Sequence, residues 1–208
     1  MSDKSNKVNE TLAFPLGDGF AQDLERALEN GKSFAIAMVD VDRFDAVNKT
    51  FGGDEGDRVL IETGRYLKDN LPKSAALYRY GGDEFGILFG GEEEKEDVFL
   101  LLESMRRNYA VRLPDGTGVT FTVGIACAPD DAAAAGELIR KAEGAMYRGK
   151  LAGSDRVCFP REDKMVTKTT HYTAEQLKRL TRLSGREGIG EAVLLREALD
   201  ALLKKYDV

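Results

Sequence analysis

The 208-residue sequence contains no tryptophan, one histidine, two cysteines and five prolines. The single histidine, His171, excludes a histidine-rich metal site. Cys127 and Cys158 lie in apolar, strand-like contexts, which in a reducing compartment indicates core packing rather than a disulfide or a metal cage. No apolar run approaches the ~20 residues of a membrane span, and the first seven residues lack the apolar core of a secretory signal. We therefore expect a cytoplasmic protein with no membrane partner.

The net charge of -6 is unevenly distributed. From Asp163 onward there are nine Lys or Arg against seven Asp or Glu, so this tail carries +2 and the preceding residues carry -8. An acidic first part is compatible with a metal-dependent nucleotide site, and a basic tail with nucleic-acid binding. Two ordinary solvated surfaces explain the same charges equally well.

Up to about residue 160, the hydrophobic pattern switches between strand and helix periods, which predicts an α/β domain. The predicted strands cover residues 33–41, 75–80, 85–89, 119–127 and 157–159. The predicted helices cover residues 56–70, 98–109 and 137–151. The first of these strands is almost continuously apolar, which predicts burial on both faces of the sheet.

A polar break at residues 160–164 marks a predicted domain boundary. The predicted organisation is an N-terminal tail at 1–11, a main domain at 12–160, a linker at 161–165 and a small domain at 166–208. In the small domain we expect a strand at 166–172, a capping box at 173–176 that opens a helix, a loop at 185–190 and a second helix. A unit of roughly 45 residues with one strand cannot bury enough apolar surface alone, so it must dock or dimerise.

Residues 79–90 read RYGGDEFGILFG, a Gly-Gly turn between two apolar strands. Gly81 and Gly82 allow a tight turn and a close approach of phosphates to the backbone. Asp83 and Glu84 are expected at an exposed tip, where their hard oxygen ligands suit magnesium.

A second pair of acids, Asp40 and Asp42, lies at the end of the buried strand at 33–41. Together with Asp83 and Glu84, they predict four carboxylates that converge on one or two Mg²⁺ or Mn²⁺ ions against a triphosphate. The alternative is that Asp40 and Asp42 end the strand as turn formers.

Residues 12–159 resemble the GGDEF-domain family of diguanylate cyclases. The resemblance depends on Gly81-Gly-Asp-Glu-Phe85, on Asp-x-Asp-x-Phe at residues 40–44, on Asn48 and on Gly56-Asp57. It implies an α+β palm-like fold, in which helices wrap a central, mostly antiparallel sheet. It also implies a Mg²⁺- or Mn²⁺-dependent homodimer that condenses two GTP molecules into cyclic di-GMP.

The resemblance assigns roles by matched position. The implied metal ligands are Asp40, the Val41 carbonyl, Asp83 and Glu84, of which Asp83 and Glu84 are also the implied catalytic residues. Asn48 and Asp57 match the guanine-binding positions. The implied phosphate-binding residues are Phe44, Gly81, Gly82 and Lys150.

Several positions depart from the family pattern. Asp45 and Gly53 replace the usual Lys and His, and Ser154 replaces a second basic phosphate ligand, with Arg156 nearby. The opening motif is eroded at residues 11–19, and residues 72–75 lack the Arg-x-x-Asp motif of product inhibition. An alternative therefore stays open, in which the chain is a transcription regulator that senses GTP without turning it over.

Residues 167–203 resemble a ribbon-helix-helix DNA-binding unit, which is a dimer whose paired strands enter the major groove. The resemblance implies that Thr167, Thr169 and His171 face DNA and that Lys168 reaches a phosphate. A helical hairpin that only pairs two subunits is the alternative.

Overall fold

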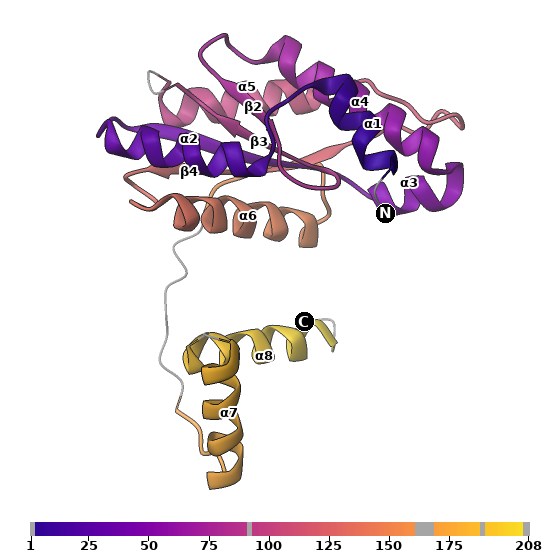
Figure 1. Cartoon of the computed structure of the whole chain (residues 1–208). Helices are drawn as coiled ribbons and strands as arrows, with labels where there is room; N and C mark the ends of the chain where they lie inside the picture. The colour runs from indigo at the N-terminus through magenta and orange to yellow at the C-terminus, as the bar shows by residue number, and fades with distance from the viewer. Residues whose placement is uncertain (1–2, 91–92, 161–168, 188–189, 206–208) are drawn as a thin grey trace. The chain divides into compact units, whose positions relative to one another are not determined.

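The computed structural model describes residues 3–90, 93–160, 169–187 and 190–205. It divides into two compact units, Met1–Glu162 and Asp163–Val208 (Figure 1). The predicted linker at 161–165 lies outside the described residues. Within the described ranges, no helix is both long enough and apolar enough to cross a membrane.

The first unit contains a five-stranded sheet with the strand order β2-β3-β1-β4-β5. Its strands are β1 (Phe34–Val41), β2 (Ala76–Arg79), β3 (Glu84–Leu88), β4 (Phe121–Ala128) and β5 (Val157–Cys158). The first four strands in this order pair antiparallel, and β5 pairs parallel with β4. The expected mostly antiparallel sheet is confirmed, and all eight residues of β1 are buried as predicted.

Six helices surround this sheet in the described part of the first unit. They are α1 (Asp3–Leu12), α2 (Gly17–Glu29), α3 (Phe44–Phe51), α4 (Gly53–Asn70), α5 (Lys95–Asn108) and α6 (Ala135–Leu151). Figure 1 shows α6 on one side of the sheet and α4 with α5 on the other. Helices α1 and α3 were not among the predicted elements: α1 covers most of the expected N-terminal tail, and the eight residues of α3 give little more than two turns of a repeat.

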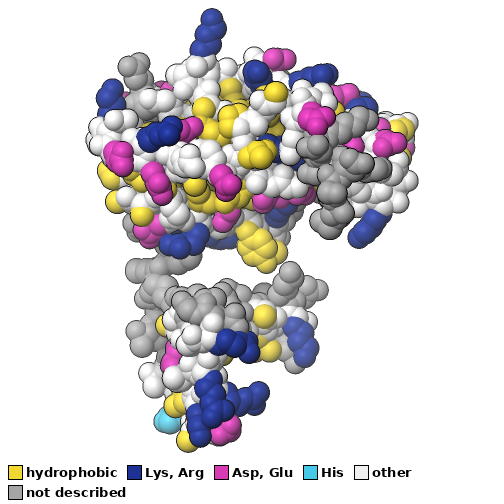
Figure 2. Space-filling model, in the orientation of Figure 1, with side chains coloured by type: hydrophobic (Ala, Val, Ile, Leu, Met, Phe, Trp, Pro, Cys, Tyr) yellow, Lys and Arg dark blue, Asp and Glu magenta, His cyan; other side chains and the backbone are white. Residues whose placement is uncertain are grey.

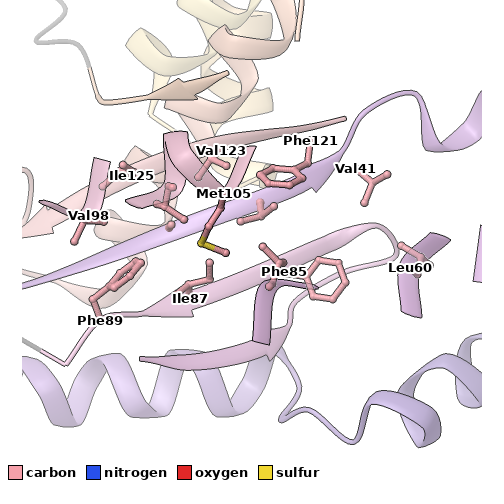
Figure 3. Close-up of a cluster of buried hydrophobic side chains, with 14 of the residues drawn as sticks. Val41, Leu60, Phe85, Ile87, Phe89, Val98, Met105, Phe121, Val123 and Ile125 are labelled. Carbon is pink, nitrogen blue, oxygen red and sulfur yellow. The ribbon is translucent and has the colours of Figure 1, made fainter. Parts of the chain in front are cut away.

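The core has two layers, one on each side of the sheet. Alternate residues of β1, such as Val39 and Val41, pack against α4 and α5, and Figure 3 shows part of this layer. The intervening residues, Ile36 and Met38, pack with Phe20 of α2 and with α6. Because strand side chains alternate between faces, Asp40 belongs to the layer that α6 covers.

The second unit consists of α7 (Ala174–Glu187) and α8 (Glu191–Lys205). The predicted capping box is confirmed, since the Thr173 hydroxyl accepts from the Gln176 N–H at 3.2 Å and Gln176 Oε1 accepts from the Thr173 N–H at 2.9 Å. The predicted loop from Gly185 is wrong at its start, because α7 continues through this glycine to Glu187. Residues 169–172 have no regular structure, and the rest of the predicted strand, including Thr167 and Lys168, lies outside the described residues.

Candidate active site

The signature turn closes on the first residue of β3. The backbone N–H groups of Tyr80 and Gly81 both donate to the Glu84 carbonyl oxygen, at 3.1 and 3.2 Å. A Cβ atom at Gly81 would lie 2.7 Å from Oε2 of Glu84, so a side chain there would make the Glu84 carboxylate move. Asp83 and Glu84 are half-buried. The expected exposed tip is therefore wrong, because the turn folds back against its own strand and against β1.

A buried arginine supports this turn from beneath. Arg79, which is 7% exposed, donates from Nη1 to the Glu84 carbonyl at 3.1 Å and from Nη2 to the Gly82 carbonyl. Its guanidinium carbon lies 4.9 Å from the centre of the Phe85 ring. Sequence reasoning gave Arg79 no role, although its place two residues before the glycine pair was a signal. The arginine fixes the backbone that presents both signature acids.

Asp40 lies at the end of β1 on the side of α6. It is 5% exposed and is paired directly with Glu84 on β3. Nζ of Lys150, in the last turn of α6, lies 2.5 Å from Oδ1 of Asp40. The N–H of Val41 donates to the Asp83 carbonyl at 3.2 Å, which joins the signature turn to the same strand end. The structure therefore gathers these five residues at one end of the sheet.

The carboxylates at this strand end repel one another. Burial raises the pKa of Asp40 to about 6, against the opposing effect of the Lys150 ammonium. The charges of Asp83 and Glu84 add to this increase. Burial also raises the pKa of Glu84, and the charges of Asp83 and Glu143 raise it further. An added cation would relieve this repulsion.

Glu143 is a residue of this site that sequence reasoning missed. It lies on α6 seven residues before Lys150, so the two side chains share one face of the helix. Its carboxylate accepts a hydrogen bond from the Tyr80 hydroxyl, and it contributes, after burial, to a raised pKa of Tyr80. The seven-residue spacing from Lys150 was the available signal in the sequence.

Asp42, which was expected to share the cation site, accepts hydrogen bonds from three groups of the protein. Its carboxylate accepts from the hydroxyls of Thr120 and Thr122, each at 2.7 Å, and from the backbone N–H of Asp155 at 3.0 Å. The side chain is 6% exposed. These three donors engage both oxygens of Asp42, and together they hold the loop after α6 against β4.

The predicted guanine-binding residues lie where α3 packs against α4. Asn48 is on α3 and Asp57 is in the first turns of α4, and both are half-buried. A Cβ atom at Gly56 would lie 3.0 Å from Cγ of Asn48 and 3.1 Å from Cζ of Phe44. The amide of Asn48 therefore covers the residue that precedes Asp57, and only glycine leaves room for it.

The loop after α6 has an unusual backbone and is held by several contacts. Gly153, Ser154 and Asp155 have φ values of 111°, 62° and 50°, which are costly for residues other than glycine. Nη1 of Arg106 lies 2.7 Å from Oδ1 of Asp155, and Nε of Arg156 donates to the Ser154 carbonyl at 3.0 Å. These contacts anchor the loop around Ser154, which lies four residues after Lys150.

The start of α3 offers backbone donors beside the same loop. Phe44 is the first residue of α3, and Arg43 before it has a φ of 55°. The first N–H groups of a helix lack partners within the helix and attract anions. A cleft of about 390 Å³ is lined by Arg43 on this side and by Ser154 and Asp155 on the other. Phe44 does not line this cleft itself, so the phosphate role expected for Phe44 stays a prediction.

The donor chemistry at the end of β1 fits a hard divalent cation. Asp40, Asp83 and Glu84 offer carboxylate oxygens, and Val41 offers a carbonyl oxygen at the same strand end. The contact of a lysine ammonium with Asp40 also indicates that this end of the sheet accepts positive charge. Among the described side chains, however, no three His, Cys, Asp or Glu residues already form a metal-binding group.

The second unit presents an apolar groove rimmed by arginines. The groove has a volume of about 570 Å³. Leucines 177, 180, 183 and 195 line it together with Arg179, Arg182 and Arg186. Figure 2 shows Lys and Arg side chains gathered over this unit. Thr169 and His171, two of the residues expected to face DNA, are exposed.

The fold and the site define an α/β domain with an acidic centre at one end of a mixed sheet. Residues 15–156 match the family model described as "Diguanylate cyclase, GGDEF domain", and residues 165–207 match a model described as "Ribbon-helix-helix domain". The chain belongs to the GGDEF diguanylate cyclase domain family and carries a C-terminal ribbon-helix-helix domain.

Relatives and solved structures agree with this membership. The chain is 31% identical over 147 residues to MucR of Pseudomonas aeruginosa, a bifunctional diguanylate cyclase/cyclic di-GMP phosphodiesterase, covering 69% of this chain and 21% of MucR. It is 32% identical over 131 residues to the diguanylate cyclase TpbB of the same species, covering 61% of this chain and 30% of TpbB. The chain thus spans less than a third of either relative. The crystal structure of the TpbB GGDEF domain is similar at a TM-score of 0.68 and 27% identity, covering 73% of this chain and 99% of that one.

Proposed function

We propose that this chain is a diguanylate cyclase, which condenses two GTP molecules into cyclic di-GMP and two pyrophosphates with Mg²⁺ or Mn²⁺ as cofactor. The observation that carries the proposal is the meeting of Asp40, Glu84 and Lys150 at the end of β1. Family membership supports the same reaction. The relatives named as diguanylate cyclases are much longer than this chain. Their activity is therefore not transferred to this chain, for which it is proposed.

The proposed roles follow from the chemistry of each group. Asp40, Asp83, Glu84 and the Val41 carbonyl would hold the divalent cation. When bound, that cation supplies charge neutralisation at the phosphoryl oxygens and a lower pKa of the attacking hydroxyl. Lys150 would hold the triphosphate from the end of α6, a role that suits a flexible ammonium.

Two further groups of residues would position the nucleotide. The N–H of Phe44 and the unbranched backbone of Gly81 and Gly82 would face the phosphates. Asn48 and Asp57 offer an amide and a carboxylate, which complement the acceptor and the donors on the guanine edge. Positioning of this kind accounts for a large part of catalysis in phosphoryl transfer.

The reaction needs two copies of the chain. Each copy would hold one GTP, and each 3′-hydroxyl would attack the α-phosphate of the other nucleotide in line, with pyrophosphate as the leaving group. A second copy bound through the apolar groove of the second unit would raise the effective concentration of the paired domains to roughly millimolar.

A direct assay tests the proposal. Purified protein is incubated with GTP and Mg²⁺, and cyclic di-GMP is measured by anion-exchange chromatography. We expect product from the wild type, none from the D83A/E84A variant, and wild-type amounts from E96A/D97A, which removes an adjacent pair of exposed acids on α5. A wild-type dimer that makes no cyclic di-GMP would contradict the proposal.

A second function is a DNA-binding regulator whose nucleotide domain senses GTP, and the ribbon-helix-helix match favours it. Gel-shift titration of the full chain on DNA at low salt tests this function. The double variant T169A/H171A should weaken binding, while K178A, an exposed site on α7, should weaken it much less. Equal binding of wild type and T169A/H171A at every salt concentration would exclude readout through this segment.

A further inference from the structure

Lys150 is positioned to serve two negative partners in turn. It lies in the last turn of α6, and its side chain keeps 32% of its surface exposed although its ammonium contacts Asp40. The Asp40 side chain is only 7% exposed and is held by strand pairing on both sides, at Glu84 and Thr122. The carboxylate is thus fixed, whereas the lysine has a long and partly solvated stem.

A buried carboxylate without a compensating charge is costly. Asp40 is surrounded by the further negative charges of Asp83 and Glu84, so its need for a cation is stronger than for a single buried acid. The Lys150 ammonium meets this need at a distance of 2.5 Å. The same oxygen that Lys150 contacts belongs to the proposed divalent cation site.

We propose that Lys150 is a resident counterion of Asp40, which leaves this carboxylate when a divalent cation binds and then becomes available to a phosphate group. The Lys150 ammonium thus neutralises Asp40 while the acid site holds no divalent cation. After a cation binds, the same ammonium can contact a phosphate of the nucleotide. The contact of Lys150 with a phosphate rests on the proposed function, whereas its release from Asp40 requires only a divalent cation.

The exchange makes the cation and the triphosphate help each other to bind. A divalent cation releases Lys150 from Asp40, and a phosphate that retains Lys150 removes a competitor from Asp40. Coupling between two ligands is reciprocal, so each should raise the affinity of the other by the same factor.

The first test measures Mn²⁺ binding to the full chain without any nucleotide, from the electron paramagnetic resonance signal of free Mn²⁺. The K150M variant should bind Mn²⁺ about two- to fivefold more tightly than the wild type, because loss of a partly exposed ion pair changes an equilibrium by about that factor. K141M, a substitution on the same helix, should leave the affinity unchanged. Equal or weaker Mn²⁺ binding by a folded K150M would overturn the proposal.

The second test uses the wild-type chain, so it does not depend on the folding of a variant. The rate at which an amine-reactive acetylating reagent modifies Lys150 is measured by peptide mass spectrometry, with and without Mg²⁺. Mg²⁺ should accelerate the modification of Lys150 several-fold and leave Lys141 unchanged. An unchanged or slower rate at Lys150 would contradict the exchange. Neither test contains GTP, so a failed cyclase assay and a failed exchange are distinguishable.

Discussion

Asp40 and Glu84 are direct cross-strand partners on β1 and β3, so two acids that are 44 positions apart in the sequence stand side by side. Like charges in directly paired positions destabilise a sheet. Asp40 is buried and Glu84 is half-buried, which makes the repulsion harder to screen. Such an arrangement costs stability in the free protein and becomes favourable when a cation is shared between the two carboxylates.

The pH dependence of stability reports this cost. Burial raises the pKa of Asp40 to about 6, from an ordinary value of 3.8. Between these values the folded state binds more protons at Asp40 than the unfolded state, so the contribution of Asp40 to stability rises as the pH falls from 6 towards 4. Above pH 6 the charged Asp40 is a full cost to the folded state.

Comparison with D40N isolates this titration. From pH 7 to pH 4, the unfolding free energy of the wild type should rise relative to that of D40N by roughly 2 kcal/mol. Urea unfolding at both pH values, without divalent cations, measures the difference. Parallel pH profiles of the two proteins would show that Asp40 titrates normally in the folded state.

Arg79 should matter for both stability and the site. In R79K the charge is kept, but the guanidinium fork that reaches the carbonyls of Gly82 and Glu84 is lost. We expect a loss of about 1 to 3 kcal/mol in unfolding free energy, because charge-assisted hydrogen bonds from a buried guanidinium are removed. Chemical denaturation measures this loss.

Arg107 provides the matched control, because it is exposed on α5 and pairs with Glu103 on the surface. R107K should change the unfolding free energy by less than about 0.5 kcal/mol. If R79K is as stable as R107K, the turn does not depend on the buried fork.

The strand pattern and the glycine turn could be predicted from the sequence because both are local signals. Burial on both faces of β1 follows from its continuous apolar run, and the turn follows from two adjacent glycines. The contact of Lys150 with Asp40 could not be derived in the same way. It joins residues 110 positions apart and depends on how α6 packs on the sheet.

The contacts of Asp42 could not be predicted from the sequence either. Its acid character and its place at the end of a buried strand resemble those of Asp40, so the sequence predicts one role for both. The hydroxyls of Thr120 and Thr122, nearly eighty positions away, give Asp42 a different role. The predicted strand of the tail is also hard to derive from one sequence, because a ribbon strand pairs with a strand of another chain.

The packing of α6 on β4 gives a sharp stability prediction. A Cβ atom at Gly124 would overlap the carbonyl oxygen of Ala142 and lie 2.5 Å from the backbone nitrogen of Met146. Backbone atoms of a helix cannot move aside singly, so G124A should lose at least about 1 to 3 kcal/mol through overpacking. Urea denaturation measures the loss.

Gly136, in the first turn of α6, has nothing within 4 Å of an added Cβ atom. G136A should therefore be neutral or gain up to about 1 kcal/mol, because alanine is the better helix former. Equal stabilities of G124A and G136A would mean that α6 does not pack this closely on β4.

The last prediction concerns Ser154, which stands where the family places a second basic phosphate ligand. Its φ of 62° is already left-handed, so arginine at this position meets the same backbone cost as serine. A new charge-assisted contact to the triphosphate is worth about 1.5 to 3 kcal/mol. S154R should therefore bind GTP roughly tenfold more tightly or better. Isothermal titration with Ca²⁺ in place of Mg²⁺ measures this affinity without turnover, and S154A should match the wild type. If S154R gains no affinity, the triphosphate does not reach the loop at residues 153–155, and the phosphate role proposed for the end of α6 loses its support.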